Sequence, residues 1–146
     1  IQDYYDLYPY GQDSPDYLFQ FAKLLQSQGR YTDSNAILRQ GTLLSCDPMF
    51  YVLMGNNYVH MEFYQEAENA YMEAHCRMPN RLYPLYQLML LYSQIGDEEK
   101  AESMAIRLLN KKEKITSPAT IEMKDRAKAL LNKYLDLIKQ VILYNN

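Results

Sequence analysis

The chain has 146 residues, of which 48% are hydrophobic and 23% charged, and this balance is typical of a folded domain rather than a disordered chain. Its formal net charge is −3, which argues against a dedicated nucleic-acid binder because such proteins usually carry a basic excess. No apolar run approaches the roughly 18 residues that a bilayer span requires, so we expect no direct membrane insertion by this chain.

The first segment, 1–14, is rich in tyrosine: four of the seven residues from Tyr4 to Tyr10 are Tyr. So many rings in so short a stretch are not expected to stay in water. We interpret the segment as a linker or as the remnant of a preceding helix that docks on the next segment of the chain. The sequence also begins at Ile1 without a charged and then apolar leader, and we expect it to be a piece of a longer protein.

A repeat of about 34 residues organises the rest of the chain. Segment 51–58 reads YVLMGNNY and segment 85–92 reads LYQLMLLY, so that Tyr58 and Tyr92 match at an offset of 34 residues. At an offset of 33, the apolar positions of segment 18–25 match those of segment 51–58. We therefore predict three repeats, at 15–47, 48–81 and 82–115.

Each repeat is expected to be a helix–turn–helix. Apolar residues recur at helical spacing on both sides of a break, and Gly29, Glu62 and Gly96 stand at equivalent places in the three breaks. Three dipeptides place a capping side chain before a proline at the first helical position: Ser14-Pro15, Asp47-Pro48 and Ser117-Pro118.

Small residues at fixed positions complete the pattern, because they let two helices approach closely. Gly55 and Ala22 occupy the small position in the first helices, whereas Met89 replaces it in the third repeat, and Ser34 replaces a small apolar residue in the first. The pattern resembles the tetratricopeptide (TPR) repeat. This resemblance implies an all-α fold, an α-solenoid of three TPR helix–turn–helix repeats.

The last predicted element is one longer helix, at about 118–143, within a C-terminal segment 116–146. Its apolar residues form one continuous stripe: Ala127, Leu130, Leu131, Tyr134, Leu135, Ile138, Val141 and Ile142. A solenoid needs its last repeat covered, which favours a capping helix. The end of the stripe is more apolar than a cap requires. An alternative interpretation is therefore that the C-terminal helix forms a homo-oligomer.

The sequence contains no recognisable catalytic constellation. Its glycines stand singly, which excludes a phosphate-binding loop, and His60 and His75 fall in different predicted helices. Cys46 and Cys76 lack metal-ligand spacing, and we place both in the second helices of successive repeats, with their redox state open. We predict no catalytic residue, no metal and no cofactor, and hence no enzyme in this chain.

Longer strings resemble a more specific family. They are Tyr5-Asp-Leu-Tyr-Pro9, Ser45-Cys-Asp-Pro-Met49, Met54-Gly-Asn-Asn-Tyr58, Pro79-Asn-Arg-Leu-Tyr-Pro-Leu-Tyr86 and Ser117-Pro-Ala with Met123-Lys124. Together they resemble the soluble C-terminal region of the O-antigen ligase/polymerase-like membrane proteins of Bacteroides-type bacteria. The resemblance implies a supporting role in the bacterial cell envelope, on the periplasmic side, attached to a membrane-anchored parent whose glycan-transfer chemistry lies elsewhere.

The leading functional prediction is a protein-interaction module or scaffold. The first helices of stacked TPR pairs line a concave face, and we call the residues expected there the first-helix surface. They are Phe19, Lys23, Met49, Val52, Asn56, His60, Tyr83, Tyr86 and Leu90. TPR grooves that grip a C-terminal carboxylate carry several polar side chains, but here Phe19, Val52 and Tyr86 occupy equivalent places. Only Lys23 and Asn56 are polar there, so the surface favours an apolar peptide segment over a carboxylate clamp. For Val52 and Leu90, packing against neighbouring helices is an equally good interpretation.

Two alternatives remain. The domain can act as an oligomerisation or spacing element of the parent, using the Tyr-rich start and the apolar tail. It can also be an accessory to glycan transfer whose tyrosines contact sugar, although tyrosines in TPR helices are more commonly core residues. We expect the partner of this chain to be a protein or a peptide.

Overall fold

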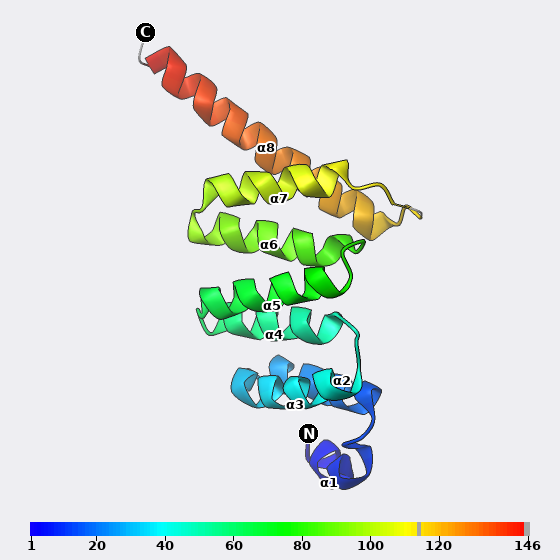
Figure 1. Cartoon of the computed structure of the whole chain (residues 1–146). Helices are drawn as coiled ribbons and strands as arrows, with labels where there is room; N and C mark the ends of the chain where they lie inside the picture. The colour runs from blue at the N-terminus through cyan, green and yellow to red at the C-terminus, as the bar shows by residue number, and fades with distance from the viewer. Residues whose placement is uncertain (114, 145–146) are drawn as a thin grey trace. The chain divides into compact units, whose positions relative to one another are not determined.

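The computed structural model describes residues 1–113 and 115–144, and these form eight α-helices and no strand (Figure 1). The helices are α1 (Gln2–Gly11), α2 (Pro15–Ser27), α3 (Tyr31–Leu44), α4 (Met49–His60), α5 (Tyr64–Arg77), α6 (Leu82–Ile95), α7 (Glu98–Asn110) and α8 (Pro118–Tyr144). The predicted all-α class and the long final helix are confirmed. Residue 114 of the predicted third repeat and residues 145–146 of the predicted C-terminal segment lie outside the described residues.

The chain divides into two compact units, Ile1–Met78 and Pro79–Asn146. In the first unit α2 packs on α3, α3 on α4 and α4 on α5, and α2 also contacts α4. One buried apolar cluster joins these helices through Ala22, Leu38, Phe50, Leu53, Met54 and Ala70. Successive helices of the repeats therefore share one core in this unit.

Glycine permits close helix approaches in the first unit. A Cβ atom at Gly55 would overlap the ring of Tyr71, and one at Gly41 would overlap the ring of Phe50. Both rings are buried, so neither can move aside without opening the core. The small residue at the Gly55 position thus does what the repeat pattern predicts: it lets α4 and α5 pack against each other.

The turns that join the two helices of each repeat have the same structure. Gly29, Glu62 and Gly96 each have a positive φ, of 73°, 62° and 79°. In each turn the residue after the positive-φ residue donates its N–H to a carbonyl five positions back: Arg30 to Leu25, Phe63 to Tyr58 and Asp97 to Tyr92, all at 2.9 Å. This is the Schellman cap. The equivalence read from the sequence is confirmed at the level of individual hydrogen bonds.

Helix α1 covers one side of the first repeat with aromatic rings. Tyr4, Tyr5 and Tyr8 surround Phe21 of α2, with ring centroids 5.4, 5.0 and 6.4 Å from it. The Tyr17 hydroxyl donates to the carbonyl of Tyr4. The tyrosine-rich start of the chain is thus helical and lies on α2, and Phe21 becomes fully buried.

Helix starts follow the capping signals at two of the three predicted places. The Ser14 hydroxyl accepts from the N–H of Tyr17 with Pro15 at the first helical position, and the Ser117 hydroxyl accepts from the N–H of Thr120. At the third place the prediction is one residue off. Helix α4 begins at Met49, whose N–H donates to Asp47 Oδ1 at 2.9 Å, and Pro48 precedes the helix.

The placement of Cys46 in a second helix is wrong. Helix α3 ends at Leu44, and Cys46 lies in the segment that leads to α4. The cause is local: the N–H of Asp47 donates to Ser45 Oγ, and Pro48 disfavours helical backbone at the residue before it. Cys46 and Cys76 are both free thiols and exposed.

In the second unit α6 pairs with α7, and α8 packs on α7 and also contacts α6 (Figure 1). Met89, Leu88, Leu108 and Ala105 are buried between them. From α8, only Ala127 and Tyr134 are buried. The predicted apolar stripe is therefore covered by α7 in its first half only, and its second half, from Leu135 onward, is exposed.

Candidate functional site

In the first unit the first-helix surface is a mixture of core and accessible side chains. Phe19 of α2 is half-buried and packs edge-on against Phe50, with ring centroids 5.2 Å apart. Lys23, one turn further along α2, is exposed, and Met49 at the start of α4 is half-buried. Val52 is only 1% exposed, so its side chain packs in the core rather than facing solvent.

The polar members at the other end of α4 are held by neighbours. The Tyr71 hydroxyl donates to Asn56 Oδ1 at 2.7 Å, which fixes the amide of Asn56. The ring of His60 is exposed and stacks on Tyr31, with centroids 4.8 Å apart and planes 5° from parallel. Phe19, Lys23, Met49, Asn56 and His60 are thus the accessible members in this unit.

In the second unit the predicted residues lie along α6. Tyr83 is half-buried, Tyr86 is 8% exposed and Leu90 is 36% exposed. Tyr86 is therefore mainly a core residue, whereas Tyr83 and Leu90 keep accessible surface. Leu90, for which packing and exposure were equally good interpretations, is on the accessible side.

Sequence reasoning missed a buried polar network that joins three helices of the first unit. Asn57 Nδ2 donates to Ser34 Oγ at 2.9 Å and to Asn35 Oδ1 at 2.7 Å. Asn57 Oδ1 accepts from Gln26 Nε2, and the Ser34 hydroxyl donates to the carbonyl of Ala22. Ser34, Asn35 and Asn57 are fully buried. The unusual Ser34 is thus one part of a hydrogen-bonded network.

A cleft of about 550 Å³ in the second unit was also missed, although it contains the predicted Tyr83. We call it the α6–α8 cleft, because it lies between the first turn of α6, the segment that joins α7 to α8, and the first turns of α8. Its lining residues are Asn80, Arg81, Leu82, Tyr83, Lys112, Glu113, Ile115, Thr120 and Met123. No local sequence signal marks it, because its walls come from three separate segments.

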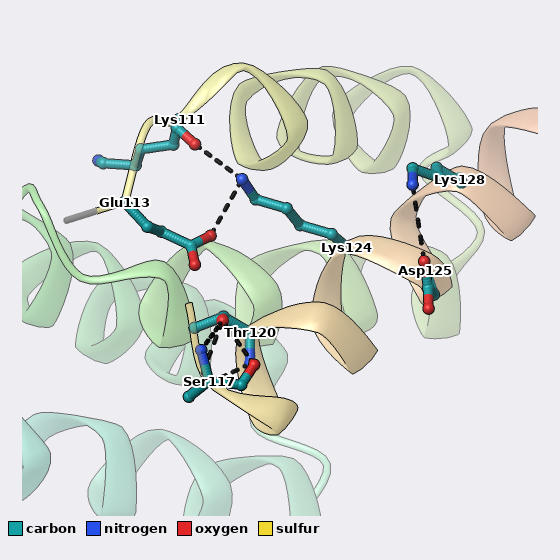
Figure 2. Close-up of polar contacts among 7 residues, drawn as sticks. All are labelled: Lys111, Glu113, Ser117, Thr120, Lys124, Asp125 and Lys128. Carbon is teal, nitrogen blue, oxygen red and sulfur yellow. Dashed lines mark hydrogen bonds and ion pairs between the residues drawn. The ribbon is translucent and has the colours of Figure 1, made fainter. Parts of the chain in front are cut away.

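One wall of the cleft is fixed by Lys124 of α8. Figure 2 shows its ammonium reaching back to the segment after α7, where it donates to the carbonyl of Lys111 at 2.8 Å and pairs with Glu113 Oε1 at 3.0 Å. Hydrogen bonds from Lys124 and Thr120 hold the pKa of Glu113 below its ordinary value. The Glu113 carboxylate is thus kept ionised, and its charge is balanced by Lys124.

Two further features of the described residues bear on function. They contain no group of three or more His, Cys, Asp or Glu side chains that are placed to hold a metal ion. Within the same part of the chain, no helix combines the length and the apolar character that a bilayer crossing demands.

No protein-family model matches this chain, and no curated protein matches it. Solved structures do. The Yersinia enterocolitica type III secretion chaperone SycD, in complex with a peptide of the translocator YopD, is 20% identical over 87% of this chain and 95% of SycD, with a TM-score of 0.74. MamA is 18% identical over 99% of this chain and 90% of its own, with a TM-score of 0.68.

The TPR domain of Sgt2 from Aspergillus fumigatus is also similar, at 13% identity over 84% of this chain and 82% of its own, with a TM-score of 0.65. At such identities the likeness defines the fold alone. The chain has the all-α fold of the TPR solenoid class, with a long helix after its third helix pair. Nothing in these comparisons bears on the O-antigen ligase resemblance.

Proposed function

We propose that this chain is a non-catalytic protein-interaction module that binds an apolar peptide segment on its first-helix surface. The observation that carries the proposal is the exposure of that surface. Phe19, Lys23, Met49 and His60 in the first unit, and Tyr83 and Leu90 in the second, keep accessible side chains on the first helices of their repeats. Half-buried aromatic rings give large contact areas at low entropic cost. The similar SycD was solved with a bound peptide, which supports this kind of partner.

We further propose that the module is an accessory domain of a membrane-anchored, O-antigen ligase-like protein of the cell envelope, on its periplasmic side. This part rests on the sequence strings alone. The sequence upstream of Ile1 tests it directly: a series of apolar segments there supports the parent, and a chain without them rejects it.

The binding function is tested by selecting a displayed random-peptide library on the whole chain. We expect enrichment of apolar peptides whose affinity, measured by fluorescence anisotropy, falls in Phe19→Ala and Tyr86→Ala. Because Phe19 also contacts Phe50 and Tyr86 is largely buried, circular dichroism must first show that both variants fold, and Lys23→Glu provides a surface variant that leaves the core intact. Leu43→Ala is the control, since Leu43 is exposed on the second helix α3. If none of the three variants weakens binding, the first-helix surface is not the peptide-binding site.

A second candidate function is self-association through α8. Tyr134 is the last buried residue of this helix, and beyond it seven large hydrophobic side chains are exposed: Leu135, Leu137, Ile138, Val141, Ile142, Leu143 and Tyr144. Figure 1 shows this part of α8 extending beyond α7. Light scattering at rising concentration tests it. A dimer that Ile138→Lys converts to monomer, while Lys139→Gln does not, supports this function; a monomer at every concentration rejects it.

A further inference from the structure

Two positively charged side chains line the α6–α8 cleft. Arg81 and Lys112 line it, and both are exposed. No ion pair to either is found among the residues that the structure describes. The acidic residue of the cleft, Glu113, is already paired with Lys124. Among the lining residues that the structure describes, the cations Arg81 and Lys112 therefore remain for a ligand.

The surroundings reinforce this positive potential. The unit Pro79–Asn146 holds eleven Lys and Arg against eight Asp and Glu, whereas the residues before it hold four against ten. The first turn of α6, which begins at Leu82 with no side-chain cap, also borders the cleft. Its free N–H groups add a smaller contribution of the same sign.

Four of the remaining lining residues are apolar or aromatic, and they lie beside the polar side chains of Asn80 and Thr120. Met123 and the ring of Tyr83 are half-buried, Leu82 is buried, and Ile115 is exposed beside them. A ligand that complements the whole cleft must therefore combine a negative charge with an apolar side chain. A free phosphate offers no apolar part, a neutral sugar offers no negative charge, and a purely apolar peptide leaves the two cations without a partner.

We propose that the α6–α8 cleft is a docking site for an acidic peptide segment that carries an apolar side chain next to its carboxylates. Arg81 and Lys112 bind the carboxylates, and the apolar side chain lies between Tyr83 and Met123. This proposal rests on the proposed interaction function and adds a second site, which shares Tyr83 with the first-helix surface. The carboxylates can belong to side chains at any position of the peptide, so the ligand does not need a free C-terminus.

The test uses the whole chain and three labelled synthetic peptides of equal length. The first has glutamates next to leucine and phenylalanine, the second has glutamine in place of each glutamate, and the third has serine in place of each apolar residue. Fluorescence anisotropy measures their binding to the wild type and to the double variant Arg81→Gln/Lys112→Gln. The double variant Lys128→Gln/Lys133→Gln is the matched control, because it removes the same charge from exposed positions of α8 outside the cleft.

We expect the acidic apolar peptide to bind best, and we expect its binding to weaken by about tenfold in Arg81→Gln/Lys112→Gln and much less in the control variant. Equal binding of the glutamate and glutamine peptides, equal loss in both double variants, or no binding of the acidic peptide overturns the proposal. None of these outcomes rejects the first-helix surface, whose own test depends on Phe19, Lys23 and Tyr86. Preference for the serine peptide would instead indicate a general polyanion site and would also overturn it.

Discussion

Glu62 has a backbone conformation that is occupied by glycine at the two equivalent positions, Gly29 and Gly96. Its φ of 62° is the only positive value at a non-glycine residue among those described, and an L-residue in this region costs roughly 1–2 kcal/mol. We expect Glu62→Gly to raise the free energy of unfolding by about 1 kcal/mol, with part of the gain offset by the greater freedom of glycine in the unfolded chain.

Urea denaturation measures this change. Gly29→Ala and Gly96→Ala are the reciprocal variants, and we expect each to lower the midpoint. A Cβ at either glycine meets no atom within 4 Å, so backbone conformation rather than a clash sets the effect. A Glu62→Gly protein no more stable than the wild type would contradict this account of the turn.

Asn57 is the centre of the buried polar network, and removal of its side chain leaves its hydrogen-bond partners unsatisfied. In Asn57→Ala, the amide of Gln26 and the acceptor of Asn35 lose hydrogen bonds of 2.7 Å. Unsatisfied buried polar groups cost about 1–3 kcal/mol each, so we expect a loss of about 2–3 kcal/mol in chemical denaturation. Asn69→Ala, at an exposed position of α5, should change stability little; an equal loss in both variants would contradict the network's role.

These two sites also show what sequence can and cannot predict at this scale. The offsets of the repeat placed Glu62 opposite Gly29 and Gly96, because a turn is a local structure that recurs with the repeat. The network was not predictable, since its members come from α2, α3 and α4 and are far apart in the sequence. From the sequence Ser34 was only a departure from the pattern.

At the level of elements, Lys124 and Glu113 connect the end of α7 to α8. The pKa of Glu113 is lowered by hydrogen bonds from Lys124 and Thr120. A carboxyl group with a depressed folded-state pKa stabilises the fold above its unfolded pKa, and this contribution is lost as pH falls through the folded-state pKa. We expect Glu113→Gln to lower Tm at neutral pH. We expect the difference from the wild type to shrink as pH falls below the ordinary glutamate pKa of about 4.3 and to vanish below the folded-state pKa of Glu113.

Thermal denaturation across the acidic range measures this difference. Glu122→Gln is the matched control, because Glu122 pairs with Arg126 on the exposed surface of the same helix at 2.9 Å, where ion pairs contribute little. A Glu113→Gln variant whose Tm differs from that of the wild type by the same amount at every pH would mean that the carboxylate charge has no role in this connection.

The helices themselves were largely predictable, and the surfaces between them less so. Helical periodicity and capping residues located α8 to within a residue of its end, because both signals are local. Whether the stripe of α8 would be covered was not predictable, since that depends on where α7 begins relative to it. Tyr86 illustrates the same limit: its repeat position predicted an open surface, yet its side chain lies in the core. For Val52 the repeat position left core packing and surface exposure equally good, and its side chain also lies in the core.

For the molecule as a whole, the last helix should matter most to the unit that contains it. Met104 and Leu108 of α7 are buried, and α8 is the helix that packs on α7 after α6. Truncation after Asn110 removes α8 and the Lys124 contacts together. Each exposed Leu- or Ile-sized side chain loses about 1.5–3 kcal/mol of burial, which is a large part of a typical ~5–15 kcal/mol stability.

We therefore expect hydrogen exchange of the truncated chain to show loss of protection across 82–110 and a weaker effect in α2 and α3, because repeats couple mainly to their neighbours. The full chain under the same conditions is the reference. Unchanged protection across 82–110 would mean that α8 does not cap the third helix pair. In that case its whole apolar stripe, and not only the part beyond Tyr134, would be available for contact with another molecule, and self-association would become the better explanation of why this helix is so apolar.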